Sequence, residues 1–100
     1  WNAYAAMPLP GSQLYKNAVD AGIDLPEDYA GYSFHAYTTK PLPTEDLTPE
    51  EILRFRDKAY LVYHNDKKFL EKVKNTYGDI AVDNIIKNTK VKLKRKILGD

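Results

Sequence analysis

The sequence predicts a mainly α-helical fold: a small helical domain of about four helices, with a long irregular loop and a short N-terminal extended segment. Two observations predict the helices: apolar residues recur at helical spacing in four stretches, and residues that start or end helices flank them. A third observation, the concentration of prolines in residues 24–47, predicts the loop. The 100 residues, of which 43% are hydrophobic and 29% charged, suffice for one domain with a modest core.

The first element is a short apolar segment, residues 1–9, which is typical of the end of a β-strand. It leads into Pro10-Gly11 and then Ser12, a good N-cap, so a helix is predicted over residues 13–21, ended by Gly22. A single strand leaves its backbone groups unpaired. We therefore expect residues 1–9 to pair with a second copy of the chain or to be disordered.

The long loop, residues 24–47, is expected to contain one helical turn starting at Pro26-Glu27-Asp28 and a short extended segment over residues 34–38. A structureless loop of this length is uncommon in a compact domain, so we expect a functional lid or a strap packed on something larger. Four aromatic residues crowd it: Tyr29, Tyr32, Phe34 and Tyr37. They are consistent with a pocket for a planar or apolar ligand and equally with packing against a further domain.

Three more helices are predicted after the loop. Thr48, Pro49 and Glu51 form a capping box with proline at the first helical position, which starts a helix running to about His64. Its predicted apolar face comprises Ile52, Phe55, Ala59 and Val62, with Tyr63 beside them.

The next helix is expected to start at Asn65 or Asp66 and to end at Gly78. Asp79 is predicted to cap the last helix, with an apolar side that continues to Ile97. Because the turns between these three helices are very short, antiparallel or steeply crossed packing is expected.

No residue of the chain is predicted to be catalytic or to bind a metal. The absence of cysteine excludes disulfides, a cysteine nucleophile and iron–sulfur ligation within these residues. His35 and His64 are 29 positions apart and have no metal-site spacing, and carboxylates cluster at Glu45, Asp46, Glu50 and Glu51. Because Glu50 and Glu51 fall in a predicted first helical turn, we interpret them as complementing the helix dipole. No apolar run is long enough to cross a membrane.

Charge is unevenly distributed, although the net charge is only +1. Residues 1–57 hold nine acids and four bases, residues 58–100 hold five acids and eleven bases, and six of those bases lie within Lys87–Lys96. This stretch predicts a solvated basic C-terminal helix. Nucleic-acid binding is not expected, since no aromatic residue is interleaved with the bases.

Three segments together resemble the C-terminal region of radical SAM enzymes, especially the cobalamin-binding group with proteins like the anaerobic magnesium-protoporphyrin monomethyl ester cyclase. Residues 2–15, with Pro8-Leu9-Pro10-Gly11-Ser12-Gln13-Leu14-Tyr15, resemble the last barrel strand and its turn. Residues 50–60 resemble the helix after the barrel, and residues 91–100 resemble a chain terminus found in such proteins. The family's cluster-binding CxxxCxxC motif is absent.

The resemblance implies that residues 1–15 are the remnant of the last barrel strand and turn, and residues 16–100 a C-terminal helical domain. It implies S-adenosylmethionine, a [4Fe–4S] cluster and cobalamin in the cytoplasmic parent enzyme, none of them held by this chain alone. Its partner would be the missing N-terminal barrel. Ala5, Ala6 and Met7 would contact the adenine of S-adenosylmethionine in the parent, or else belong to the barrel core.

The alternative hypothesis is an autonomous helical interaction module that binds a protein or nucleic acid through its basic last helix. A salt titration distinguishes the two, because nucleic-acid binding weakens steeply with salt.

Overall fold

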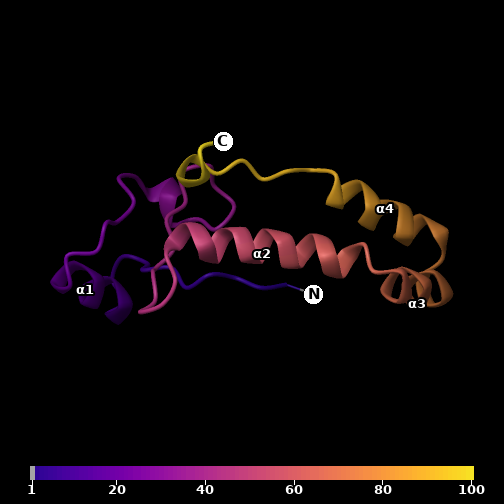
Figure 1. Ribbon diagram of the computed structural model, residues 1–100, viewed down its shortest axis with the longest axis horizontal. Helices are drawn as coiled ribbons and strands as arrows, with labels where there is room; N and C mark the ends of the chain where they lie inside the picture. Colours follow the sequence, from indigo (N-terminus) through magenta and orange to yellow (C-terminus); the bar gives the residue numbers. More distant parts are fainter. Residues whose placement is uncertain (1) are drawn as a thin grey trace. The chain divides into compact units, whose positions relative to one another are not determined.

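The computed structural model describes residues 2–100 and confirms the mainly helical fold class (Figure 1). Over these residues there are four α-helices, two 3-10 turns and no β-strand. The elements in chain order are α1 (Gln13–Asp20), η1 (Tyr29–Tyr32), α2 (Pro49–His64), α3 (Lys67–Tyr77), α4 (Asp79–Thr89) and η2 (Lys96–Leu98).

The chain divides into two compact units. The loop unit consists of residues 4–54 and 93–100, and the helical unit consists of residues 2–3 and 55–92 of the described chain. Helix α2 contributes its first turns to the loop unit and the rest to the helical unit. The predicted division of the chain into a barrel remnant, residues 1–15, and a helical domain, residues 16–100, stays a prediction.

The starts of α1, α2 and α3 confirm the predictions from capping residues. Ser12 and Asp66 each accept a hydrogen bond from the backbone amide three residues on, at 3.1 and 3.0 Å. At α2 the capping box is complete: Thr48 Oγ1 accepts from the amide of Glu51 at 3.2 Å, and Glu51 Oε2 accepts from the amide of Thr48 at 2.8 Å. Helix-initiating side chains act over three residues, so they can be recognised in sequence alone.

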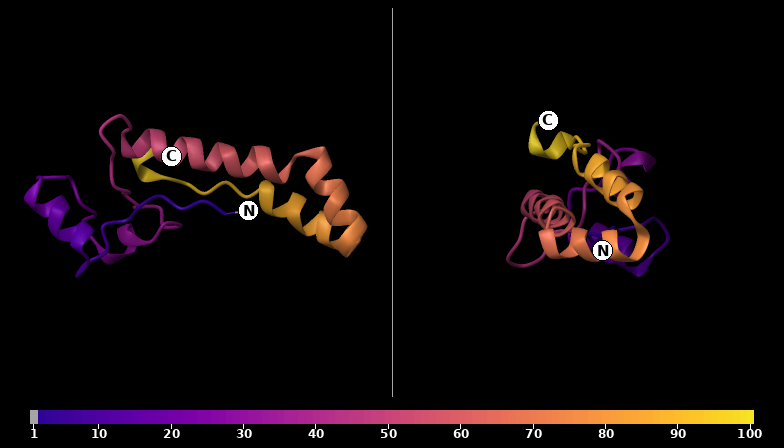
Figure 2. Two further views of the ribbon diagram at one scale, coloured as in Figure 1. Left: turned by 90° about the horizontal axis from the view of Figure 1, so that it is seen from below. Right: turned by 90° about the vertical axis from the view of Figure 1, so that its right-hand side faces the viewer.

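Helices α3 and α4 of the helical unit pack directly against each other and cross at a steep angle (Figure 2). Gly78, with φ +90°, ends α3, and a non-glycine residue would be strained there. The expected capping by Asp79 is wrong: Gly78 occupies the cap position, so Asp79 is the first helical residue and α4 has no side-chain cap.

The predicted continuation of the last helix to Ile97, and with it the basic C-terminal helix, is also wrong. Helix α4 ends at Thr89, and residues 91–95 have no helical structure. A helix through this stretch would place Lys90 near Lys94 and Lys92 near Lys96, and like charges four residues apart destabilise helices. An irregular, largely extended chain instead turns Arg95 inward, where it is 0% exposed, and leaves the lysines at the surface.

The buried side of α2 differs from the predicted apolar face. Phe55 and Val62 are 76% and 63% exposed, whereas Leu53, Arg56 and His64 are buried. A buried arginine is tolerated where its donors are used: Arg56 Nε donates to the carbonyl of Ala3 at 3.0 Å. The predicted apolar face of α2 was therefore wrong because arginine was assumed to lie at the surface.

In the loop unit, successive turns replace the extended segment predicted for residues 34–38. The amides of Ser33, Ala36 and Thr39 each donate to the carbonyl three residues back, at 2.9, 3.1 and 3.3 Å. The predicted single helical turn is present, but it is η1, which starts at Tyr29 after its cap Asp28 and not at Pro26.

The C-terminal segment holds this series of turns in place, and Figure 1 shows η2 beside it. Arg95 Nη1 donates to the carbonyl of Phe34, and the guanidinium carbon lies 5.0 Å from the centroid of the Phe34 ring. The amide of Lys96 donates to the carbonyl of Tyr37 at 2.9 Å, and Tyr37 Oη donates to the carbonyl of Asp100 at 2.9 Å. A buried cation therefore organises the loop.

Candidate functional site

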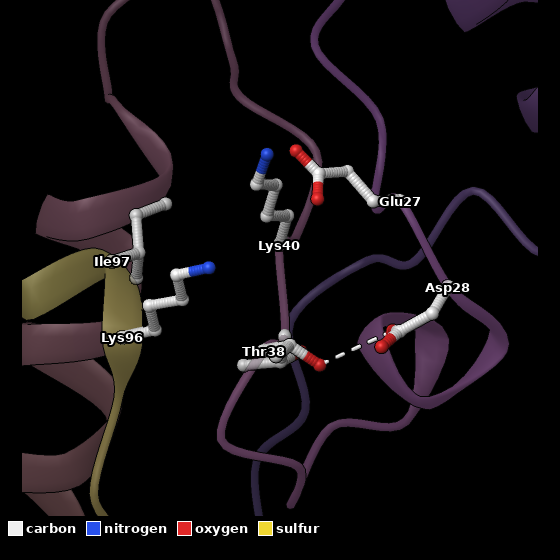
Figure 3. Close-up of a pocket in the computed structure, with 7 residues that line it drawn as sticks. Glu27, Asp28, Thr38, Lys40, Lys96 and Ile97 are labelled. Atoms are coloured by element: carbon white, nitrogen blue, oxygen red, sulfur yellow. Dashed lines mark hydrogen bonds between the residues drawn. The ribbon is translucent and has the colours of Figure 1, made fainter.

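A cavity of about 390 Å³ lies in the loop unit, between η2 and residues 27–28 and 38–40 of the long loop (Figure 3). Two carboxylates, two hydroxyls, two ammonium groups and one isoleucine line it. The polar residues are Glu27, Asp28, Thr38, Thr39, Lys40 and Lys96. None of them was predicted from sequence to form a site.

Local structure places Asp28 at the cavity wall. As the cap of η1, Asp28 Oδ1 accepts from the amide of Gly31 at 2.9 Å and from Thr38 Oγ1 at 3.3 Å (Figure 3). Asp28 Oδ2 has no hydrogen-bond donor among the described residues. One oxygen thus anchors the side chain, and the other remains available.

The ammonium groups differ in their partners. Lys40 Nζ lies 3.0 Å from Asp24 Oδ2, in a pair whose carboxylate is exposed. Lys96, carried by η2, has no carboxylate partner within the described chain. Figure 3 shows the side chains of Lys96 and Asp28 reaching into the cavity from opposite sides. The two opposite charges therefore face one space without forming an ion pair.

Thr39, in the cavity wall, is 0% exposed, and its Oγ1 has no hydrogen-bond partner among the described residues. A buried unsatisfied hydroxyl costs stability, and valine has nearly the same shape. We expect Thr39→Val to raise the free energy of unfolding by about 1 kcal/mol. Urea denaturation followed by circular dichroism measures the change. Thr44→Val is the contrast, because the exposed Thr44 hydroxyl accepts from the amide of Leu47 at 3.0 Å and its removal is not expected to raise stability. A loss of stability in Thr39→Val would contradict the assignment.

The loop aromatics do not line this cavity. Phe34 is buried and packs edge-on against Tyr4, with ring centroids 5.4 Å apart. Tyr29 is 85% exposed. Phe34 therefore packs inside the loop unit itself, which is neither the ligand pocket nor the packing against a further domain that was expected. For the other loop aromatics both interpretations stay predictions.

Tyr32 of the long loop has a raised pKa. Burial raises the pKa of its hydroxyl above the ordinary 10.0, and the neighbouring Tyr15 and Tyr29 raise it further. The folded protein therefore keeps this proton at pH values where the unfolded chain loses it, so stability falls as the pH rises above about 10. In a spectrophotometric tyrosinate titration, Tyr32→Phe is expected to remove a component that titrates above pH 10, and Tyr77→Phe, at an exposed tyrosine that does not contribute to the shift, serves as control. If that component stayed unchanged in Tyr32→Phe, it would contradict this.

Ala5, Ala6 and Met7, the candidate adenine contacts, lie in the extended N-terminal segment of the loop unit. The carbonyl of Ala6 accepts from the amide of Leu42 at 2.9 Å, and the carbonyl of Met7 accepts from the amide of Leu9 at 2.9 Å. Ala5 and Met7 are half-buried and Ala6 is exposed. The structure does not bring them together with the cavity, whose lining residues are different.

The histidines are placed as packing residues. His64 is buried, its Nδ1 donates to the carbonyl of Tyr60 at 2.9 Å, and the two rings lie 4.1 Å apart. His35 is exposed beside Phe34. Within residues 2–100 no three histidine, aspartate or glutamate side chains form a group that could hold a metal ion. Glu51 serves the capping box, in agreement with the interpretation of the acidic cluster.

Sequence reasoning missed the cavity because its walls come from two distant segments. Asp28 and Lys96 are 68 positions apart and are brought together by the bonds that Arg95 and its neighbours make to the loop. The feature of the sequence that could have indicated a cavity residue is Asp28, because aspartate is a typical cap before a short helical turn.

Comparison with known proteins returned no match: no family model, no curated protein and no solved structure is significantly similar to this chain. No helix in residues 2–100 combines the length and the apolar character that crossing a membrane requires.

Proposed function

We propose that this chain is the C-terminal, non-catalytic region of a radical SAM enzyme of the cobalamin-binding type, which packs on the catalytic barrel of its parent. The observation that carries the proposal is the exposure of apolar side chains in the helical unit. Phe55, Tyr77 and Ile80 are 76–79% exposed, whereas Val73 is the buried apolar residue of this unit. A unit that buries so little apolar surface gains stability when a larger body covers it.

The extended N-terminal segment supports the same proposal. Within the described residues it forms no sheet, yet it leads through Pro10-Gly11-Ser12 directly into α1, as the last strand and turn of a barrel would. The amides of Ala5 and Ala6 have no backbone acceptor within the described chain. They are thus suited to bond a neighbouring strand or the edge of an adenine ring.

The cofactors of the family belong to the rest of the parent. An iron–sulfur cluster requires thiolates, and the chain has no cysteine, so these residues do not fit a cluster. No step of the radical chemistry is assigned to them. Their proposed role is to cover and position the barrel in a cytoplasmic enzyme.

The decisive test is the reading frame upstream of Trp1. The proposal expects a CxxxCxxC motif about a barrel's length earlier, and a frame without it would refute the assignment. A second possibility, pairing of the N-terminal segments of two copies, is tested by light scattering over a range of concentrations. A mass that stays monomeric at all concentrations would exclude that pairing.

A further inference from the structure

We propose that the cavity of the loop unit binds a small zwitterion, an α-amino acid or a ligand carrying an aminocarboxylate group. Its ammonium group would bond Asp28, and its carboxylate would bond Lys96. This site goes beyond the proposed function and does not depend on it.

The first argument is the charge arrangement. Asp28 and Lys96 face the same space from opposite sides, and neither has an ion-pair partner among the described residues (Figure 3). If the two side chains were within ion-pair distance, they would neutralise each other's charge. Both side chains are exposed to water, and a ligand with both charges would bridge the gap and form a charge-assisted hydrogen bond with each of them.

The second argument is the neutrality of the lining. Two carboxylates and two ammonium groups give it a formal charge of zero. A simple anion such as phosphate would lie near Glu27 and Asp28, and a simple cation would lie near Lys96, since Asp24 already pairs with Lys40. Like charges repel both, so a dipolar ligand fits the wall better than either ion.

The third argument is that Asp28 is held in place before any ligand arrives. Its Oδ1 is fixed by the amide of Gly31 and by Thr38 Oγ1, which leaves Oδ2 for a ligand. A preorganised acceptor loses little conformational entropy on binding. The volume of about 390 Å³ is large enough for an amino acid, and Ile97 offers an apolar contact to its side chain.

Three related probes test the proposal without altering the protein. The ¹⁵N-labelled chain is titrated with L-alanine, with N-acetyl-L-alanine, which lacks the ammonium group, and with L-alanine methyl ester, which lacks the carboxylate. L-alanine is expected to shift amide resonances of residues 27–28, 38–40 and 96–97. Each derivative is expected to bind at least about tenfold more weakly, because it loses one charge-assisted contact.

Two variants and a control locate the site. Asp28→Asn keeps an oxygen that can cap η1 and removes the charge, and Lys96→Met keeps most of the aliphatic stem. Each is expected to weaken L-alanine binding by about tenfold or more. Lys94→Met, on the same segment but outside the cavity lining, is expected to leave binding unchanged.

Several outcomes would overturn the proposal. One is that L-alanine does not bind at about 10 mM. Another is that L-alanine and N-acetyl-L-alanine bind equally well, which would indicate a plain anion site. A third is that neither variant changes the binding of L-alanine. Should Asp28→Asn fail to fold, Lys96→Met and the probe series decide the question.

Discussion

Replacing Arg95 by alanine is expected to lower the free energy of unfolding of the loop unit by about 3–4 kcal/mol. Arg95 is fully buried, donates to the carbonyl of Phe34 and stacks on the Phe34 ring. Truncation leaves that carbonyl without this donor and opens a space where the guanidinium and its stem were packed. For a domain with a total stability of only about 5–15 kcal/mol, this is a large fraction.

Hydrogen exchange is the measurement of choice, because it reports on each unit separately. The amide of Lys96, bonded to the carbonyl of Tyr37, and the amide of Leu42, bonded to the carbonyl of Ala6, should lose protection in Arg95→Ala. Arg95→Lys keeps the charge but not the planar fork, so an intermediate loss is expected. The control Lys94→Ala should differ from the unaltered chain by less than about 0.5 kcal/mol. A similarly small effect of Arg95→Ala would contradict the role of Arg95.

The ends of most elements could be predicted from the sequence because they depend on local bonds. Ser12, Thr48 and Asp66 each satisfy an amide within three residues, and Gly22 and Gly78 adopt positive φ angles that glycine favours. These interactions need no distant partner. The helix starts at residues 13, 49 and 67 were therefore predicted from a single sequence.

The buried faces and the cavity could not be predicted in the same way. Arg56, His64 and Arg95 are charged or polar by type, and their burial depends on the carbonyls of Ala3, Tyr60 and Phe34. Two of these acceptors are more than 50 positions away from their donors. Hydrophobic periodicity assigns such residues to the solvent side. For this reason the predicted buried side of α2 was wrong, and the last helix was wrongly predicted to continue through residues 90–97.

The buried side of α2 can be tested with two residues only two positions apart. Leu53 is 0% exposed and Phe55 is 76% exposed, whereas the sequence pattern placed Phe55 on the apolar face. Leu53→Ala removes buried methyl groups and leaves a cavity, so a loss of about 3 kcal/mol in the free energy of unfolding is expected.

Phe55→Ala provides the matched control for Leu53→Ala in the same helix. It removes a larger side chain, but one already in contact with water, and alanine is the better helix former by up to about 0.7 kcal/mol. We therefore expect the stability of Phe55→Ala to be unchanged or slightly raised in chemical denaturation of the 100-residue chain. An equal loss in both variants would mean that Phe55 belongs to the core, and the proposed docking to a catalytic barrel would lose one of the three exposed apolar residues on which it depends.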